Sequence, residues 1–321
     1  MSETILEVDN LRKTFGGIVA VDGATFDIEQ GSITGLIGPN GAGKTTTFNL
    51  ISGFYEPDGG EVRYDGQRLQ ELMRPSRDEK VIWGGAAGIT AGALGGIAGL
   101  GPLGLGAAPS LATLAGGAAV GSGLYVGQEA VKQNRESHKN SRPYMLAREG
   151  MVRTFQITRE LSEMTTLENL MLAPQGQAGE NLVNTWLRRG KVSAEESAIR
   201  ERAEEMLELL EIEHIRDEEA GNLSGGQRKL LELGRVLMLD PELILLDEPV
   251  AGVNPSLTRK LMDRIEVLRD EGYTFCIVEH DMEVIMNLSD TIIVMNEGAK
   301  LTEGSPEEIR NNEAVIEAYL G

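Results

Sequence analysis

The chain of 321 residues contains little cysteine, few aromatic residues and few lysines. Its single cysteine, Cys276, excludes an internal disulfide and fits a reducing compartment. Aromatic residues make up only 4% of the chain although 41% of it is hydrophobic, so a core must be mainly aliphatic. The length is enough for one large domain or two small ones.

Positive charge is also scarce, with 30 basic residues (9 Lys and 21 Arg) against 50 acidic ones and a formal net charge of -20. Such a surface repels phosphate backbones, so we expect no nucleic-acid partner. An acid-rich, lysine-poor surface also stays hydrated in high salt, but this composition does not decide whether the protein comes from a high-salt habitat. The N-terminal MSETILEVDN has neither a basic region nor an apolar run, so we expect no signal peptide and a cytoplasmic chain.

Charge is absent altogether from residues 81–128, which hold 15 of the 40 glycines. The flanking sequences are ordinary: residues 62–73 predict a strand, a turn at Asp65-Gly66 and a polar helix start, and residues 150–156 predict another strand. We therefore expect a single domain over residues 1–321, with residues 75–146 forming a Gly/Ala-rich insertion within it.

Elsewhere the sequence alternates in the manner of an α/β protein. Short apolar runs at 33–37, 243–246, 275–278 and 291–295 predict strands buried on both faces, hence a parallel sheet covered by helices. Residues 194–210 have apolar side chains at helical spacing.

The segment GPNGAGKTT begins at Gly38, directly after the predicted strand 33–37, and a helix-like stretch follows it. In this context the pattern is typical of a loop whose backbone N–H groups close around phosphate oxygens. Lys44 is then placed to reach the β- and γ-phosphates of a nucleotide, and the Thr45 hydroxyl to ligate Mg²⁺.

The segment LILLDEP places Asp247 and Glu248 at the end of another apolar strand. Carboxylates in such a place are costly unless they are paired or hold a metal. Beside a phosphate loop, Asp247 fits a role in holding Mg²⁺, and Glu248 fits a role in polarising an attacking water.

Together with LSGGQ at residues 223–227, these motifs resemble the ATP-binding subunits of ABC transporters. Phe15, Gln156, AGVNP at 251–255 and His280 follow the family order, although Asn254 stands where many members carry Asp. The stretches GFYEPDGGEVRYDG, RTFQITRELSEMTTLENL, DEPVAGVNP and VIEAYLG narrow the resemblance to the branched-chain amino acid (LivG-type) ATP-binding proteins. It covers roughly residues 4–73 and 147–321.

The resemblance implies a P-loop NTPase fold of the ABC ATPase type, with a RecA-like parallel sheet core, an antiparallel β subdomain and a helical subdomain. It implies a subunit that binds and hydrolyses ATP to energise an importer, above all for branched-chain amino acids. Lipid or lipopolysaccharide export stays open as an alternative, and a soluble ABC ATPase without transport is less favoured.

The family also implies a peripheral location at the cytoplasmic face of the membrane. The implied partners are transmembrane permease subunits docking at residues 157–172, a second ABC ATPase subunit and, indirectly, an extracytoplasmic binding protein. A heterodimer is favoured over a homodimer.

The resemblance implies an ATP site shared by two subunits, with Lys44 of one facing the LSGGQ segment of the other. Catalytic roles fall to Glu248, His280, Lys44 and Gln156, and Mg²⁺ contacts to Thr45, Gln156 and Asp247. The expected nucleotide contacts are Phe15, Gly38, Pro39, Asn40, Gly41, Ala42, Gly43, Lys44, Thr45, Thr46, Ser224, Gly225, Gly226 and Gln227.

The uncharged tract leaves three interpretations open. The first interpretation is a membrane hairpin. Residues 81–100 are long enough to cross a bilayer once, and Gly84, Gly88, Gly92 and Gly96 would share one face of a helix. The second interpretation is a helical hairpin packed on the protein or on its permease. The third is a flexible insert.

Overall fold

The computed structural model describes residues 3–73, 143–154, 160–177, 179, 186 and 189–320. The larger of the two units of the chain is compact and comprises residues Met1–Leu72 and Arg142–Gly321. The predicted insertion therefore lies outside the described residues up to residue 142. Within the described ranges, no helix is both long and apolar enough to span a bilayer.

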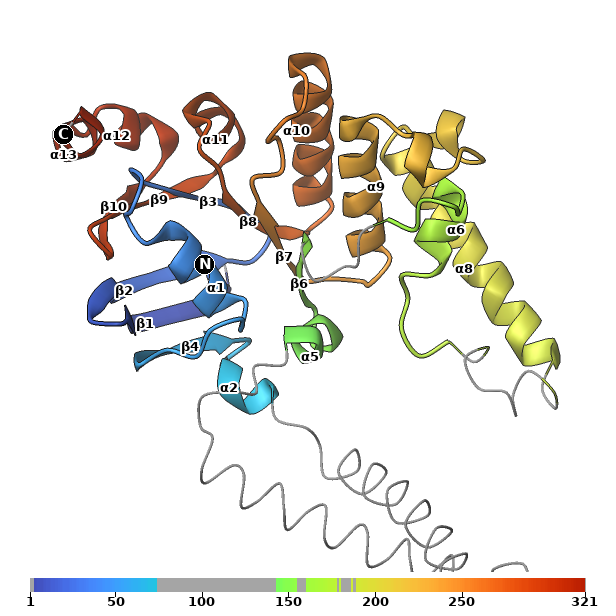
Figure 1. Cartoon of the computed structure of the whole chain (residues 1–321), viewed down its shortest axis with the longest axis horizontal. Helices are drawn as coiled ribbons and strands as arrows, with labels where there is room; N and C mark the ends of the chain where they lie inside the picture. The colour runs from blue at the N-terminus through green and yellow to red at the C-terminus, as the bar shows by residue number, and fades with distance from the viewer. Residues whose placement is uncertain are drawn as a thin grey trace, which may run out of the picture. The chain divides into compact units, whose positions relative to one another are not determined.

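The larger unit is built on a six-stranded sheet with the strand order β10-β9-β3-β8-β7-β6 (Figure 1). The five strands from β9 to β6 are parallel, and β10 runs antiparallel to β9. Every residue of β3 and β8 is buried, as the continuous apolar runs predict. The strands are β3 (Ile33–Ile37), β6 (Met151–Arg153), β7 (Leu243–Asp247), β8 (Thr274–Val278), β9 (Thr291–Asn296) and β10 (Ala299–Gly304).

A second, antiparallel sheet has the order β2-β1-β4-β5. The turn predicted at Asp65-Gly66 joins β4 to β5, and both residues have positive φ (48° and 69°), as a tight hairpin turn of this hand requires. The predicted polar helix start follows as α2. The elements are β1 (Thr4–Phe15), β2 (Ile18–Glu29), β4 (Gly59–Tyr64), β5 (Gln67–Arg68) and α2 (Leu69–Leu72).

Helices cover the parallel sheet, and α6, α8 and α9 pack against one another beside it (Figure 1). The predicted apolar face is confirmed in α8 and the residue after it, because Ala203 and Leu210 are fully buried and Ile199 and Met206 pack against the core. The helices are α1 (Lys44–Ile51), α5 (Pro143–Arg148), α6 (Thr166–Met171), α8 (Arg189–Leu209), α9 (Gly225–Leu237), α10 (Pro255–Asp270), α11 (Met282–Leu288), α12 (Pro306–Arg310) and α13 (Glu313–Leu320), with short 3₁₀ turns η3 (Glu213–Ile215) and η4 (Ala220–Asn222).

The core between sheet and helices is aliphatic, as the shortage of aromatic residues predicts. Cys276 lies in β8 and is fully buried, and this burial raises the pKa of its thiol to about 12. Leu146 in α5 is also fully buried, so the end of the predicted insertion, at residues 143–146, belongs to the larger unit.

The middle of β3 leaves no room for a side chain. A Cβ added to Gly35 would lie 2.6 Å from Ser289 Oγ and 2.8 Å from Ile285 Cγ2. We therefore predict that Gly35→Val lowers the free energy of unfolding by about 1–3 kcal/mol, measured by urea denaturation. The control is Gly190→Ala in α8, where a Cβ meets no heavy atom within 4 Å. Equal stability of the two variants would contradict the tight contact between β3 and α11.

Candidate active site

The predicted site residues converge because three parallel strands end at one edge of the sheet. Strand β8 lies between β3 and β7, and Asp247 pairs with Val278 at the carboxyl ends of β7 and β8. The phosphate loop follows β3, Glu248 follows β7 and His280 follows β8. Ligands of open α/β sheets bind at this edge, so residues distant in the sequence meet where a site is expected.

The glycines of the phosphate loop are required by the backbone around them. Gly38, Gly41 and Gly43 have φ of 153°, 83° and 92°. A Cβ on Gly38 would lie 2.2 Å from the Met295 carbonyl oxygen, and one on Gly43 would lie 2.5 Å from that of Ala20. Packing of the loop against β9 and β2 therefore excludes side chains at Gly38 and Gly43.

Lys44 is the first residue of α1, whose N-cap, Gly43, supplies no side-chain cap to the free N–H groups of the first turn. Its Nζ donates to the carbonyl oxygens of Gly38 (2.7 Å) and Pro39 (3.0 Å). Burial lowers the pKa of Lys44, and the negative charge of Glu248 opposes this effect. The loop thus holds a cation within the Coulomb field of the predicted catalytic carboxylate.

The remaining predicted loop contacts differ in exposure. Asn40, Gly41 and Thr45 are exposed, Thr46 is half-buried, and Ala42 is buried under the loop. The Thr45 hydroxyl is therefore accessible to a metal ion at the start of α1. The backbone of Ala42 is bonded within the protein, since its N–H donates to the Pro39 carbonyl oxygen at 3.2 Å and its carbonyl oxygen accepts the Gly298 N–H at 3.1 Å.

Glu248 and His280 are in contact, with 2.9 Å between Glu248 Oε1 and His280 Nε2. The Glu248 backbone has a φ of 49°, an uncommon conformation for a residue with a side chain, and its N–H donates to the Val278 carbonyl oxygen at 2.8 Å. Both side chains remain about half exposed. The pair is thus aimed by the backbone and still open to a substrate.

Asp247 has a cationic partner that the sequence interpretation did not assign. Arg153, at the end of β6, is 6% exposed, and its guanidinium lies 2.8 Å from Asp247 Oδ2. Burial lowers the pKa of Arg153, while the hydrogen bond to Asp247 and its negative charge raise it. The carboxylate charge is therefore compensated within the protein.

The guanidinium of Arg153 is fixed by α1 and the residues after it. It donates to Asn49 Oδ1 (2.6 Å) and Ser52 Oγ (2.9 Å), and it lies 4.7 Å from the centre of the Phe48 ring and 4.9 Å from that of Phe54. These contacts join the helix that follows the phosphate loop to the strand that carries Asp247.

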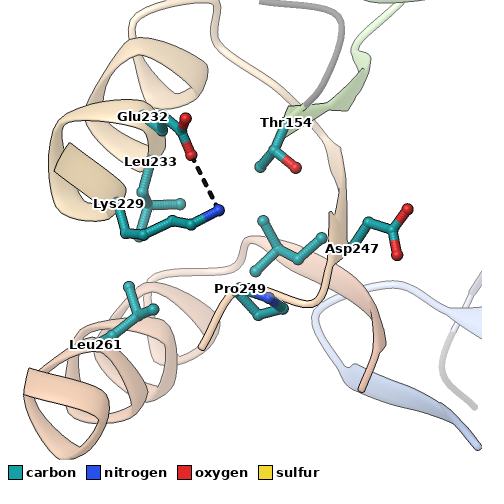
Figure 2. Close-up of a pocket in the computed structure, with 8 residues that line it drawn as sticks. Thr154, Lys229, Glu232, Leu233, Asp247, Pro249 and Leu261 are labelled. Atoms are coloured by element: carbon teal, nitrogen blue, oxygen red, sulfur yellow. Dashed lines mark ion pairs between the residues drawn. The ribbon is translucent and has the colours of Figure 1, made fainter. Parts of the chain in front are cut away.

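Asp247 also borders a small cavity of about 20 Å³ (Figure 2). Lys229 and Glu232 form an ion pair on its wall at 3.4 Å, and the Asp247 carboxylate points away from it. The space suits about one water molecule and is far too small for a nucleotide.

The donor set fits Mg²⁺ of the kind that phosphate loops hold. A hydroxyl from Thr45 and a carboxylate from Asp247 are oxygen ligands, and bound phosphates supply others. The described residues contain no cluster of three or more His, Cys, Asp or Glu side chains, and such a site does not require one. Gln156, the third predicted ligand, lies outside the described residues, so its role stays a prediction.

The predicted base-stacking residue, Phe15, ends β1 and is 41% exposed. Its ring meets the edge of Tyr55, with 5.3 Å between the ring centres, and Lys13 Nζ lies 5.6 Å from its centre. An exposed, supported aromatic face is suitable for stacking on a nucleobase.

The LSGGQ segment forms the start of α9. Ser224 caps the helix, and Gln227 Oε1 accepts the Ser224 N–H at 2.9 Å. A Cβ on Gly226 would lie 1.7 Å from Leu257 Cδ2, whereas one on Gly225 would meet open space. Figure 1 shows α9 and α1 in different parts of the unit.

Sequence interpretation missed Arg153, Glu279 and Tyr55. A signal existed for the first two, because a charged residue that ends a buried apolar strand needs a partner. Glu279 follows β8 and is 4% exposed. Tyr55 carried no signal, since its contact with Phe15 depends on how β1 packs.

Comparison with known proteins agrees with this geometry. The ABC transporter family model matches residues 21–86 and 95–251, and the branched-chain amino acid ATP-binding cassette transporter model matches residues 299–321. The probable branched-chain amino acid transport ATP-binding protein LivG of Archaeoglobus fulgidus is 36% identical, covering 99% of this chain and 95% of its own. The high-affinity branched-chain amino acid transport ATP-binding protein BraF of Pseudomonas aeruginosa is 35% identical, covering 100% and 99%.

Solved structures extend the likeness to three dimensions. A nucleotide-free ATP-binding cassette from an ABC transporter has a TM-score of 0.66 at 31% identity, covering 99% of this chain and all of that one. The ADP conformation of an ATP-binding cassette of an ABC transporter has a TM-score of 0.66 at 29% identity, covering both chains fully. The predicted fold class is confirmed.

The buried ion pair generates a prediction. Replacing Arg153 by Met leaves Asp247 without its cation, which we expect to lower the free energy of unfolding by about 3 kcal/mol, measured in urea. The control is Arg12→Met, because the Arg12–Asp22 pair is exposed on both sides (54% and 59%) and should contribute under about 1 kcal/mol. Equal losses would mean that the Asp247 contact stabilises no more than a surface pair.

Proposed function

Since the chain belongs to the ABC transporter family as one of its ATP-binding proteins, and is an ATPase, we propose that its ATP hydrolysis drives the import of branched-chain amino acids. The cargo is supported by relatives named for branched-chain amino acid transport along the whole chain. It is supported also by the family model that matches residues 299–321. Selection of the amino acid belongs to the permease and the binding protein.

The observation that carries the hydrolytic mechanism is the Glu248–His280 contact beside Lys44. Lys44 and the first turn of α1 bind the phosphates. Glu248 accepts a hydrogen bond from the attacking water and takes its proton. His280 donates to Glu248, which orients the carboxylate, and it contacts the γ-phosphate as charge moves onto it.

Mg²⁺ would be held by Thr45, Asp247 and Gln156. When bound, it neutralises phosphate charge during transfer to water. The protein contributes the positions of these oxygen ligands. For Asp247 that position is set by Arg153, which occupies one carboxylate oxygen and leaves the other for the metal.

We further propose a shared site between two such ATPase subunits, with LSGGQ of one facing the phosphate loop of the other. The separation of α9 from α1 within one chain supports this arrangement. Gly225 supports it too, since open space above the first turn of α9 would admit phosphate oxygens. A heterodimer is favoured because the LivG-type resemblance implies a related second ATPase.

The permease would dock at residues 157–172, with the complex at the cytoplasmic face of the membrane. In the described part of this segment, Leu161 and Leu172 are 45% and 51% exposed. Leu161 precedes α6 and Leu172 follows it, and Thr165 and Glu168 form a capping box at the start of this helix. Exposed apolar side chains before and after a capped helix suit a protein contact.

Substituting Glu248 by Gln tests the mechanism in the assembled transporter. We expect kcat for ATP hydrolysis to fall by about 10²–10³-fold with ATP binding retained, because the amide cannot accept the proton. Uptake of leucine, isoleucine and valine should fall in parallel. The control is Glu283→Gln, an exposed glutamate on α11.

Unchanged hydrolysis in Glu248→Gln would contradict the catalytic assignment. Normal uptake of the three amino acids after deletion of the whole chain would contradict the cargo and leave the ATPase intact. Accumulation of lipid or lipopolysaccharide on the inner side after that deletion would support export instead.

The insertion is tested by removing residues 81–128. Because the larger unit comprises Met1–Leu72 and Arg142–Gly321, we expect the shortened chain to retain ATP hydrolysis within about twofold. If the tract is a membrane hairpin, only the full-length chain stays in washed membranes after its permeases are removed. Release of both versions would contradict the membrane anchor, and loss of folding on deletion would contradict the insertion.

A further inference from the structure

A buried carboxylate outside the known motifs lies directly behind the catalytic pair. Glu279 follows β8 and is 4% exposed. Burial raises its pKa, and the backbone N–H groups of Val250, His280 and Asp281 oppose this effect. An ionisable group in such a place is costly unless it makes specific bonds. An aliphatic residue would fill the same space at lower cost.

The two oxygens of Glu279 bond to two different loops. Oε1 accepts the Val250 N–H at 2.9 Å, and Oε2 accepts the His280 N–H at 3.1 Å. Val250 lies two residues after Glu248, in the turn that follows β7. One carboxylate therefore joins the backbone that carries the catalytic glutamate to the backbone that carries the histidine.

The side chains of Glu248 and His280 form a second connection between the two loops, with 2.9 Å between Glu248 Oε1 and His280 Nε2. The strand pairing ends at the bond from the Glu248 N–H to the Val278 carbonyl. Beyond it, the described contacts that hold the two loops together are the bonds to Glu279 and the catalytic contact itself.

We propose that Glu279 is a positioning residue for ATP hydrolysis, which sets the separation of Glu248 and His280 by bonding the backbone of both loops. This rests on the proposed roles of Glu248 and His280. It acts on the chemical step and not on ATP binding, because the phosphate loop is held by separate contacts. Those contacts are the Lys44 bonds to Gly38 and Pro39.

The first variant is Glu279→Gln, which keeps the shape of the side chain. Its amide oxygen can accept one N–H, but its NH₂ group faces the other N–H as a second donor, so one of the two loops is released. In the assembled transporter we expect kcat to fall by about 10–100-fold, since small displacements of catalytic groups have effects of this size. The KM for ATP and the affinity for ATP should change by less than about twofold.

Glu283→Gln is the matched control, because this glutamate lies four residues along, on the exposed side of α11. It should retain full kcat. Glu279→Asp is the second variant in case the Gln variant does not fold. Its shorter carboxylate keeps both acceptors but reaches only one loop, and we expect the same fall in kcat. A normal kcat in a folded Gln or Asp variant would overturn the proposal.

A double-mutant cycle separates positioning from simple structural support. In a His280→Ala background, Glu279→Gln should lower kcat by less than about twofold further, because the geometry it maintains no longer serves catalysis. An undiminished effect in that background would overturn the proposal. Full activity of His280→Ala and of Glu248→Gln alone would instead refute the proposed mechanism, which is a distinguishable result.

Discussion

The parallel pairing of β3, β8 and β7 is the constraint on which the site depends. In the observed register of these strands, the residues that follow them lie at one edge of the sheet. No side chain of the site needs to reach across the fold. A shift of one strand by one residue would turn every one of its side chains to the other face and move Glu248 relative to His280. Because every residue of β3 and β8 is buried, packing on both faces opposes such a shift, and at Gly35 this packing leaves no room for a side chain.

Charge is handled in two ways at this edge. The buried charges have partners within the protein: Arg153 with Asp247, Lys44 with loop carbonyls, and Glu279 with backbone N–H groups. Glu248 and His280 remain about half exposed and bond to each other. The buried groups therefore hold positions at a desolvation cost that their bonds offset. Because Glu248 and His280 are exposed, a substrate can reach both side chains.

How far the sequence predicts this arrangement depends on whether a residue acts through local or distant contacts. The phosphate loop, the strand ends and the LSGGQ helix start were predictable, because each is a local pattern of strand, turn and cap. The parallel sheet followed from uninterrupted apolar runs, and the fold class from the order of the motifs. Arg153 was visible as a charged residue in a buried strand, but its partner was not. That partner depends on β6 lying beside β7, a pairing that no local pattern encodes.

The tract at 81–128 has composition as its only signal, and composition leaves three structures open.

One departure from the family pattern can be judged from the contacts around it. Asn254 stands where many members carry Asp, and here it caps α10, with its Oδ1 accepting the Leu257 N–H at 3.0 Å. Asn and Asp are comparable caps, since each offers a side-chain oxygen to the first turn. The substitution therefore preserves the start of α10 and the position of Leu257.

That position matters because the missing side chain of Gly226 lets α9 pack directly on Leu257. The turn leading into Asn254 begins at Glu248, and its Val250 N–H is held by Glu279. A continuous set of contacts thus runs from LSGGQ through the cap of α10 to the catalytic pair. A change in the cap that moved Leu257 would therefore affect both the LSGGQ segment and the catalytic pair. An oxygen at position 254, rather than a charge, is what this geometry requires.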